Sequence, residues 1–150
     1  MSNQKSFNQL IEYIETFSDD HKQIKTFGVG FRFDLNKSVT ETNNFPLLYV
    51  QPISHNINKN VQNYTLRIYI HDLKQKDSSN EIEVLSDTLQ IINDLYKYIK
   101  NDTTNNDFDI VNIPVSFPNT NYTTEYTTGW FSDFQIQVTL NESDCDIPIT

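Results

Sequence analysis

The feature that most limits how this chain can fold is an apolar stripe that runs from Ile82 to Ile99. Large apolar side chains recur there at steps of three and four, which places them on one face of a helix: Ile82, Leu85, Leu89, Ile92, Tyr96 and Ile99. Glu81 near the start and Lys97 and Lys100 near the end suit the helix dipole. Ser78 and Glu81 have the spacing of a capping box, which predicts where the helix begins. At 1.5 Å per residue the helix would be about 30 Å long, enough to cross a whole sheet.

The rest of the sequence predicts one more helix and five strands. Residues 6–17 repeat apolar side chains with a helical period, and Ser6 with Gln9 resembles a capping box. Alternation of apolar and polar residues, or a short apolar run, marks the expected strands: 27–35, 45–50, 64–71, 108–117 and 130–140. Pro114 interrupts the fourth strand, which we therefore expect at a sheet edge or with a break.

This order, α-β-β-β-α-β-β, predicts an α+β fold with a mainly antiparallel sheet of about five strands. Packing both helices on one face of the sheet would bury both apolar stripes. The 150 residues fit a single domain, 1–150, with residues 141–150 as an acidic, possible extended C-terminal tail. The polar segments 36–44, 54–60 and 119–128 are expected to be loops.

Composition disfavours several classes of function. The net charge of −9 argues against tight binding to nucleic-acid phosphates, which needs clustered lysine and arginine. A single cysteine, Cys145, excludes an intrachain disulfide. No apolar run reaches the ~20 residues that span a bilayer, and the first residues lead into no apolar signal segment. We expect no contact with a membrane and no secretion.

No residue pattern predicts catalysis, a cofactor or a metal. Gly28 and Gly30 lie inside an alternating strand, so close packing by a neighbour is favoured over a phosphate loop. The three histidines are scattered without metal-ligand spacing and are expected to be exposed to solvent. The acidic residues 142–146 lack the spacing of a calcium loop. The chain is not expected to be an enzyme.

The polar faces of two expected strands allow two interpretations. Arg32 and Asp34 lie on the first strand, and Arg67, Tyr69 and His71 lie on the third. These faces would either contact a neighbouring subunit or be solvated. Long polar loops often carry function, so we expect the loops and the tail to contact neighbours. The expected subunit-interface residues are Arg32, Asp34, Thr40, Asn43, His55, Asn58, Arg67, Tyr122, Tyr126, Asp144 and Asp146.

Three segments carry a resemblance to a known family and together cover most of the chain from residue 45 onward. They are the strand Phe45-Pro46-Leu47-Leu48-Tyr49-Val50-Gln51-Pro52, the helix opening at 79–89, and Gly129-Trp130 with the strand that follows and ends at 141–148. They resemble the small neck and tail ring proteins (tail-terminator or tail-completion-like) of crAss-like and related tailed bacteriophages. The expected order of elements also resembles the tail-terminator fold.

The resemblance implies a virion structural protein with no catalytic residues and no cofactor. It implies a homo-oligomeric ring, a hexamer or dodecamer, around the DNA exit channel between the portal or neck and the tail. DNA would pass without specific binding, and assembly would take place in the host cytoplasm. The alternative is a small phage-encoded protein-binding module or host-directed regulator, with an exposed aromatic patch near Tyr122 and Tyr126. An enzyme is the least favoured class, because it would need a pocket of convergent titratable groups.

Overall fold

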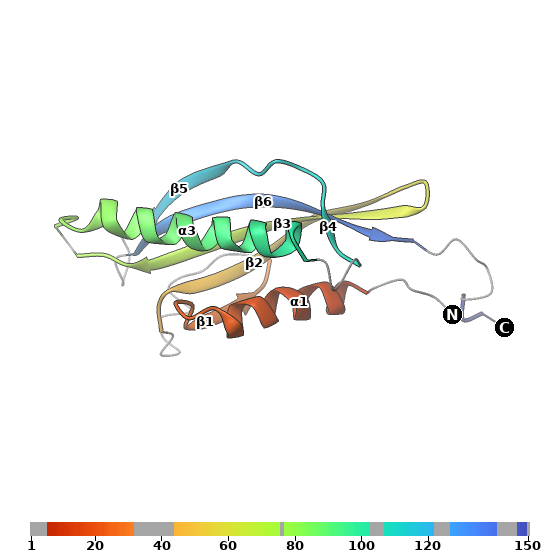
Figure 1. Cartoon of the computed structure of the whole chain (residues 1–150), viewed down its shortest axis with the longest axis horizontal. Coiled ribbons are helices and arrows are strands. Elements are labelled where there is room, and N and C mark those ends of the chain that lie inside the picture. Colours follow the sequence, from red (N-terminus) through yellow and green to blue (C-terminus); the bar gives the residue numbers. More distant parts are fainter. Residues whose placement is uncertain are drawn as a thin grey trace.

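The computed structural model describes residues 6–31, 44–75, 77–102, 107–121, 127–140 and 147–149. Within these residues two helices and six strands follow one another along the chain (Figure 1). Their bounds are α1 Phe7–Asp20, β1 Thr26–Val29, β2 Leu47–Asn58, β3 Val61–Leu73, α3 Glu81–Lys100, β4 Asp109–Ile110, β5 Ser116–Asn121 and β6 Thr127–Thr139.

The six strands form one open, mostly antiparallel sheet, which confirms the α+β prediction. The strand order is β1-β2-β3-β6-β4, and β5 pairs with β6 along the same edge as β4. Among the six described strands, only β1 and β2 run parallel. The sheet has one strand more than predicted, because the expected strand 108–117 is two strands, β4 and β5, separated around Pro114.

Both helices pack on one face of the sheet. The core joins Leu48 and Val50 of β2 to Ile68 and Ile70 of β3 and to the facing residues of β6, all on the same side of the pleat. The helices bury these side chains against them: Leu10, Tyr13, Ile14 and Phe17 from α1, and Ile91, Ile92, Leu95 and Ile99 from α3. At about 25 cal/mol per Å² of apolar surface, this single layer is the main source of stability.

The helix predictions hold in their positions but not in every detail. The capping box of Ser6 and Gln9 is present at the start of α1. At α3 the predicted capping box is wrong, because Asn80 is the N-cap residue and Ser78 has a left-handed backbone, with φ 61°. The buried stripe is also rotated toward Val84 and Thr88, leaving Ile82 78% exposed.

Thr88 explains the rotation of the buried stripe. Its hydroxyl donates to the carbonyl oxygen of Val84, one turn back, at 2.7 Å. A threonine that satisfies its own hydroxyl in this way can occupy a core position. A pattern that counts only apolar residues assigns that position to the polar face.

The predicted loop 54–60 is mostly strand, and this expectation was wrong. Strand β2 continues to Asn58 and pairs with β3 through a tight turn at Lys59 and Asn60, with a bulge between Pro52 and Ser54. Lys59 has a φ of 55°, as a two-residue hairpin turn requires. The hairpin projects past the helices (Figure 1). Polar side chains lie on both of its faces, with Ile53 and Ile57 exposed among them, so the sequence shows no regular alternation there.

The other strand boundaries differ by a few residues. Strand β1 ends at Val29, earlier than predicted, and residues 32–35 of that expected strand lie outside the described residues. The expected loop 119–128 contributes the end of β5 and the start of β6, while 122–126 lie outside the described part. Gly28 packs closely, as predicted: a Cβ there would lie 2.9 Å from Cδ2 of Tyr49.

Candidate functional site: an aromatic row and an apolar edge

Three of the predicted interface residues are described, and the structure does not bring them together. His55 and Asn58 lie on the projecting hairpin, and Arg67 lies in the middle of β3. The pleat puts His55 and Arg67 on opposite faces of the sheet. The other predicted interface residues lie outside the described part of the chain: Arg32, Asp34, Thr40, Asn43, Tyr122, Tyr126, Asp144 and Asp146.

Arg67 lies on the face opposite the helices and is held within its own chain. Its guanidinium donates two hydrogen bonds to the carboxylate of Asp133, at 2.8 and 3.1 Å, and lies 4.9 Å above the ring of Phe131. The hydrogen bonds to Asp133 raise the pKa of Arg67 above its usual value. Such a bidentate pair fixes the side chain on the sheet.

A row of aromatic rings crosses the same face. Tyr49 of β2, Tyr69 of β3, Phe131 of β6 and Phe117 of β5 occupy one register position. Successive ring centroids are 6.3, 5.7 and 5.5 Å apart, within the range of favourable aromatic contacts. The row ends at Phe117, whose side chain is 52% exposed at the edge of the sheet. At the other end Gly28 of β1 lies beneath the ring of Tyr49.

His71 is fully buried, so the expectation that the histidines are exposed is wrong for this residue. It lies between Leu47 of β2 and Gly129 of β6 in the sheet, and its Nδ1 is 3.2 Å from the hydroxyl of Thr127. Burial lowers its pKa to about 4. Alternation assigns this position to a polar face, but in the fold the imidazole is covered and contacts Thr127.

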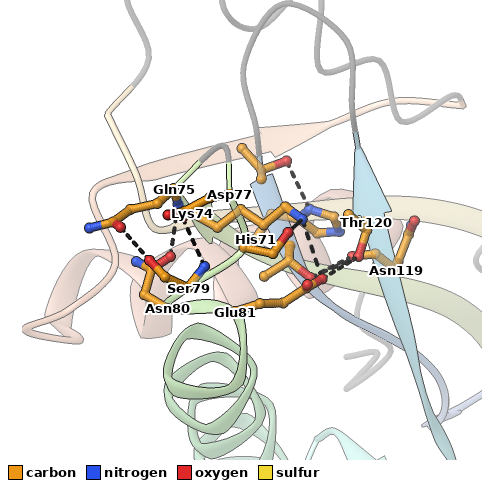
Figure 2. A network of polar contacts seen from close by, with 12 residues as sticks. His71, Lys74, Gln75, Asp77, Ser79, Asn80, Glu81, Asn119 and Thr120 are labelled. Atoms are coloured by element: carbon orange, nitrogen blue, oxygen red, sulfur yellow. Dashed lines mark hydrogen bonds and ion pairs between the residues drawn. The ribbon is translucent and has the colours of Figure 1, made fainter.

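A polar network joins the end of β3 to the start of α3 (Figure 2). The ammonium of Lys74, whose side chain is fully buried, donates to the hydroxyl of Ser78 at 2.9 Å and lies 3.4 Å from the carboxylate of Glu81. Thr120 of β5 donates to the same carboxylate at 3.3 Å. Asn80 accepts a hydrogen bond from the amide of Gln75. The network ties β3, β5 and α3 together, which is a structural role.

A pocket of about 330 Å³ opens between the α1–β1 connection and α3. Lys22, Lys25, Asp72 and Asp87 line it, and burial and the charge of Asp87 raise the pKa of Asp72. Its one hydroxyl, that of Thr88, is donated to a main-chain carbonyl. The described lining therefore offers amines and carboxylates of opposite charge, and we assign no reaction class to it.

The β4–β5 edge carries a run of exposed apolar side chains. Val111, Ile113, Val115 and Phe117 are all exposed, and Ile113 is 88% exposed. The segment bends away from β6 around Pro114, between β4 and β5. Beside it a hollow of about 190 Å³ is lined by Ile92, Asn93, Tyr96, Ile113, Pro114, Ser116 and Phe134. This apolar edge is the strongest candidate functional surface in the described chain.

Asn112 holds the apolar edge against the sheet. Its amide nitrogen donates to the carbonyl oxygen of Asp133 at 2.9 Å, and its side-chain oxygen accepts from the amide of Gln135 at 3.0 Å. One side chain thus replaces the main-chain pairing that a regular strand would supply, because the ladder is interrupted between β4 and β5.

Asn112→Ala is expected to lower the free energy of unfolding by about 1–2 kcal/mol, because two main-chain groups lose their partner. Chemical denaturation measures the loss. Hydrogen exchange should show faster exchange of the Gln135 amide. The control Asn112→Asp keeps the acceptor and should protect that amide partly. Unchanged exchange in the alanine variant would contradict this role for Asn112.

The opposite edge of the sheet is also apolar. Among the described residues β1 pairs on one side only, with β2. Val29 ends β1 and is 42% exposed, and Phe31 two residues later is 84% exposed. The apolar residues of neither edge were predicted as interface residues from the sequence, which favoured the polar Arg32 and Asp34 on the first expected strand. The apolar residues at 111, 113, 115 and 117, combined with the prolines at 114 and 118, were the available signal for an exposed edge.

Comparison with protein-family models and with curated proteins finds no match to this chain. Across the described ranges, no helix has the length and apolar character to cross a membrane. In the same part of the chain, no three histidine, cysteine, aspartate or glutamate side chains are grouped to hold a metal ion.

Proposed function

We propose that this protein is a self-associating assembly subunit whose copies join head to tail into a closed ring. The observation that carries the proposal is the pair of unlike apolar edges on one sheet. Phe31 and Val29 lie at the β1 edge, and Ile113, Val115 and Phe117 lie at the β5 edge. Exposed apolar side chains gathered in this way mark interaction surfaces.

Unlike edges favour a ring over a two-fold dimer. A two-fold interface uses the same patch on both subunits, whereas contact between two different patches repeats from copy to copy until it closes. Burying one large apolar side chain at each contact stabilises it by about 1.5–3 kcal/mol. In a closed ring the β1 edge of each copy contacts the β5 edge of its neighbour, so both apolar edges of every copy are covered.

The resemblance to phage neck and tail ring proteins supports the biological setting of this proposal. The ring is a hexamer or dodecamer of the virion neck or tail, assembled in the host cytoplasm against adjacent neck, portal or tail proteins. The net charge of −9 suits the wall of a channel that lets DNA pass without holding it.

A second candidate function is a protein-binding module, and the aromatic row favours it. Phe117 is exposed, and Tyr49 and Phe131 are partly exposed, on the face opposite the two helices, whereas Tyr69 between them is 9% exposed. Aromatic side chains often anchor protein partners. A binding module would remain monomeric and bind through this face, whereas a ring subunit associates through its edges.

Native mass spectrometry over a concentration series tests the proposal. The wild type should give a discrete closed species of six or twelve copies. Ile113→Ser should weaken each contact by about 2 kcal/mol, a roughly thirtyfold lower association constant. The control Ile57→Ser changes an equally apolar, exposed side chain on the hairpin and should leave the species intact. A wild type that stays monomeric at every concentration would contradict self-association.

A further inference from the structure

We infer that Phe31 of one copy inserts into the hollow beside β5 of the next copy, so that the sheet continues from subunit to subunit. The inference rests on the proposed self-association and names the contact that produces it. The occupant of the hollow is therefore a second copy of this chain. Four features support it: the register of the sheet, the face on which the side chains lie, the size of the hollow, and the charges at the other end of the same edge.

The register of the sheet matches the two edges. Val29 lies in a row that runs through Val50, Ile68 and Ser132 to Ser116, from one edge of the sheet to the other. Strand β5 runs antiparallel to β1, because β1 and β2 are parallel and each later pair is antiparallel. If Val29 of a second copy lies opposite Ser116 of the first, the antiparallel register places Phe31 of the second copy opposite Pro114 of the first. Pro114 and Ser116 both line the hollow.

The two partners also lie on the same face. Phe27 and Val29 share the helix-bearing face with Leu48 and Val50, their neighbours in the sheet. Phe31 follows Val29 by two residues, and the amide of Gly30 still donates to the carbonyl of Val50, so the chain keeps its line along β2. The hollow opens on this face too, because residues of α3 line it.

The hollow suits a phenyl ring in size and chemistry. Its volume is about 190 Å³, and its walls include Ile92, Tyr96, Ile113 and Phe134. A cavity of about 150 Å³ lined by apolar side chains accepts benzene. Phe31 is 84% exposed within its own chain, so burial there removes a large apolar surface from water.

Charge is complementary at the other end of the same edge. Thr26 lies in a row that ends at Asn119. The register that seats Phe31 therefore brings Lys25, just before β1, beside Thr120. Thr120 contacts Glu81, and the exposed Glu83 lies in the same first turn of α3. Lys25 is exposed, so a cation approaches an acidic turn in which Glu81 is already paired with Lys74 and Glu83 is exposed.

The aromatic row on the face opposite the helices agrees with the same register. Gly28 begins the aromatic row and Phe117 ends it. Copies joined in this register place Phe117 of one beside Tyr49 of the next, whose ring lies over Gly28. The row of rings then continues across the contact. Pro114 and Pro118 lack amide hydrogens, so side chains, more than main-chain pairing, determine the register.

Engineered disulfides test the register directly. The variant Val29→Cys with Ser116→Cys, in a Cys145→Ser background, pairs two residues that the inference places opposite each other. Opposed residues have Cα atoms about 4.5–5.5 Å apart, within disulfide range. Within one chain the same residues are four strand spacings apart, about 19 Å, so no intrachain bond can form. Mild oxidation should give a ladder of covalent multimers on a non-reducing gel.

The control Val29→Cys with Phe117→Cys moves one cysteine to the opposite face and should give no ladder. A ladder from the first pair alone supports the inference. Closed oligomers by native mass spectrometry without that ladder would overturn the inference and leave the proposed ring standing. Monomers in both measurements would overturn both. Phe31→Ala should lower the association constant about thirtyfold or more while the circular dichroism stays unchanged.

Discussion

Gly129→Ala is expected to destabilise this fold more than any other replacement of a glycine. A Cβ on Gly129 would lie 1.8 Å from the carbonyl oxygen of Ile70 and 2.9 Å from the Cα of His71. Both are main-chain atoms of β3, the strand beside β6 in the centre of the sheet, so neither can move without breaking the ladder. We expect a loss of about 3 kcal/mol or more in the free energy of unfolding.

Differential scanning calorimetry should show the melting temperature fall by about 10 °C, given the size of the chain. The matched control is Gly30→Ala. The nearest atom to its Cβ is the hydroxyl oxygen of Tyr49, the far end of a flexible side chain, so it should cost much less. Equal melting temperatures for the two variants would mean that the main chain of β3 moves away from an added methyl group at no greater cost than the side chain of Tyr49 does.

The spacing of apolar residues along the chain was enough to predict the fold class, but it did not predict the bounds of the strands toward the edges and ends of the sheet. Apolar periodicity predicted both helices and the central strands, because their side chains face a single core. It missed the hairpin beyond Pro52, where polar residues on both faces surround the exposed Ile53 and Ile57 and pairing with β3 keeps the strand extended. For 108–117 it predicted an edge position or a break at Pro114, and both are present, but nothing local shows that Asn112 replaces main-chain pairing at the break.

The apolar edge at β4 and β5 was harder to predict from the sequence, because exposure at an edge depends on the order of the strands. Val111, Ile113, Val115 and Phe117 have the spacing of a buried strand face, and the position of the β4–β5 segment at the edge of the sheet leaves them exposed. Polar residues such as His55 and Arg67 were favoured as contacts, yet Arg67 is paired within the chain. Which apolar residues are exposed depends on the strand order, a long-range property.

His71 should make the protein less stable as the pH falls from 7 to 5. Burial lowers the pKa of His71 from 6.5 to about 4, so the folded protein keeps it neutral while the unfolded chain takes up a proton. The stabilisation is complete above pH 6.5 and is lost as the pH falls toward 4. Linkage gives a loss of about 2 kcal/mol in the free energy of unfolding between pH 7 and pH 5.

The measurement is urea denaturation at half-unit steps of pH, for the wild type and for His71→Asn. An asparagine amide can occupy the place of Nδ1 beside the hydroxyl of Thr127 but has no proton to gain in this range. The variant should therefore lose the pH dependence that His71 supplies, whatever constant offset its smaller side chain causes. Burial and the charge of Asp87 raise the pKa of Asp72, which acts in the opposite direction, so the difference between the two proteins isolates His71. Identical slopes would mean that His71 becomes protonated as readily in the fold as in the unfolded chain, and that the centre of the sheet admits a charge.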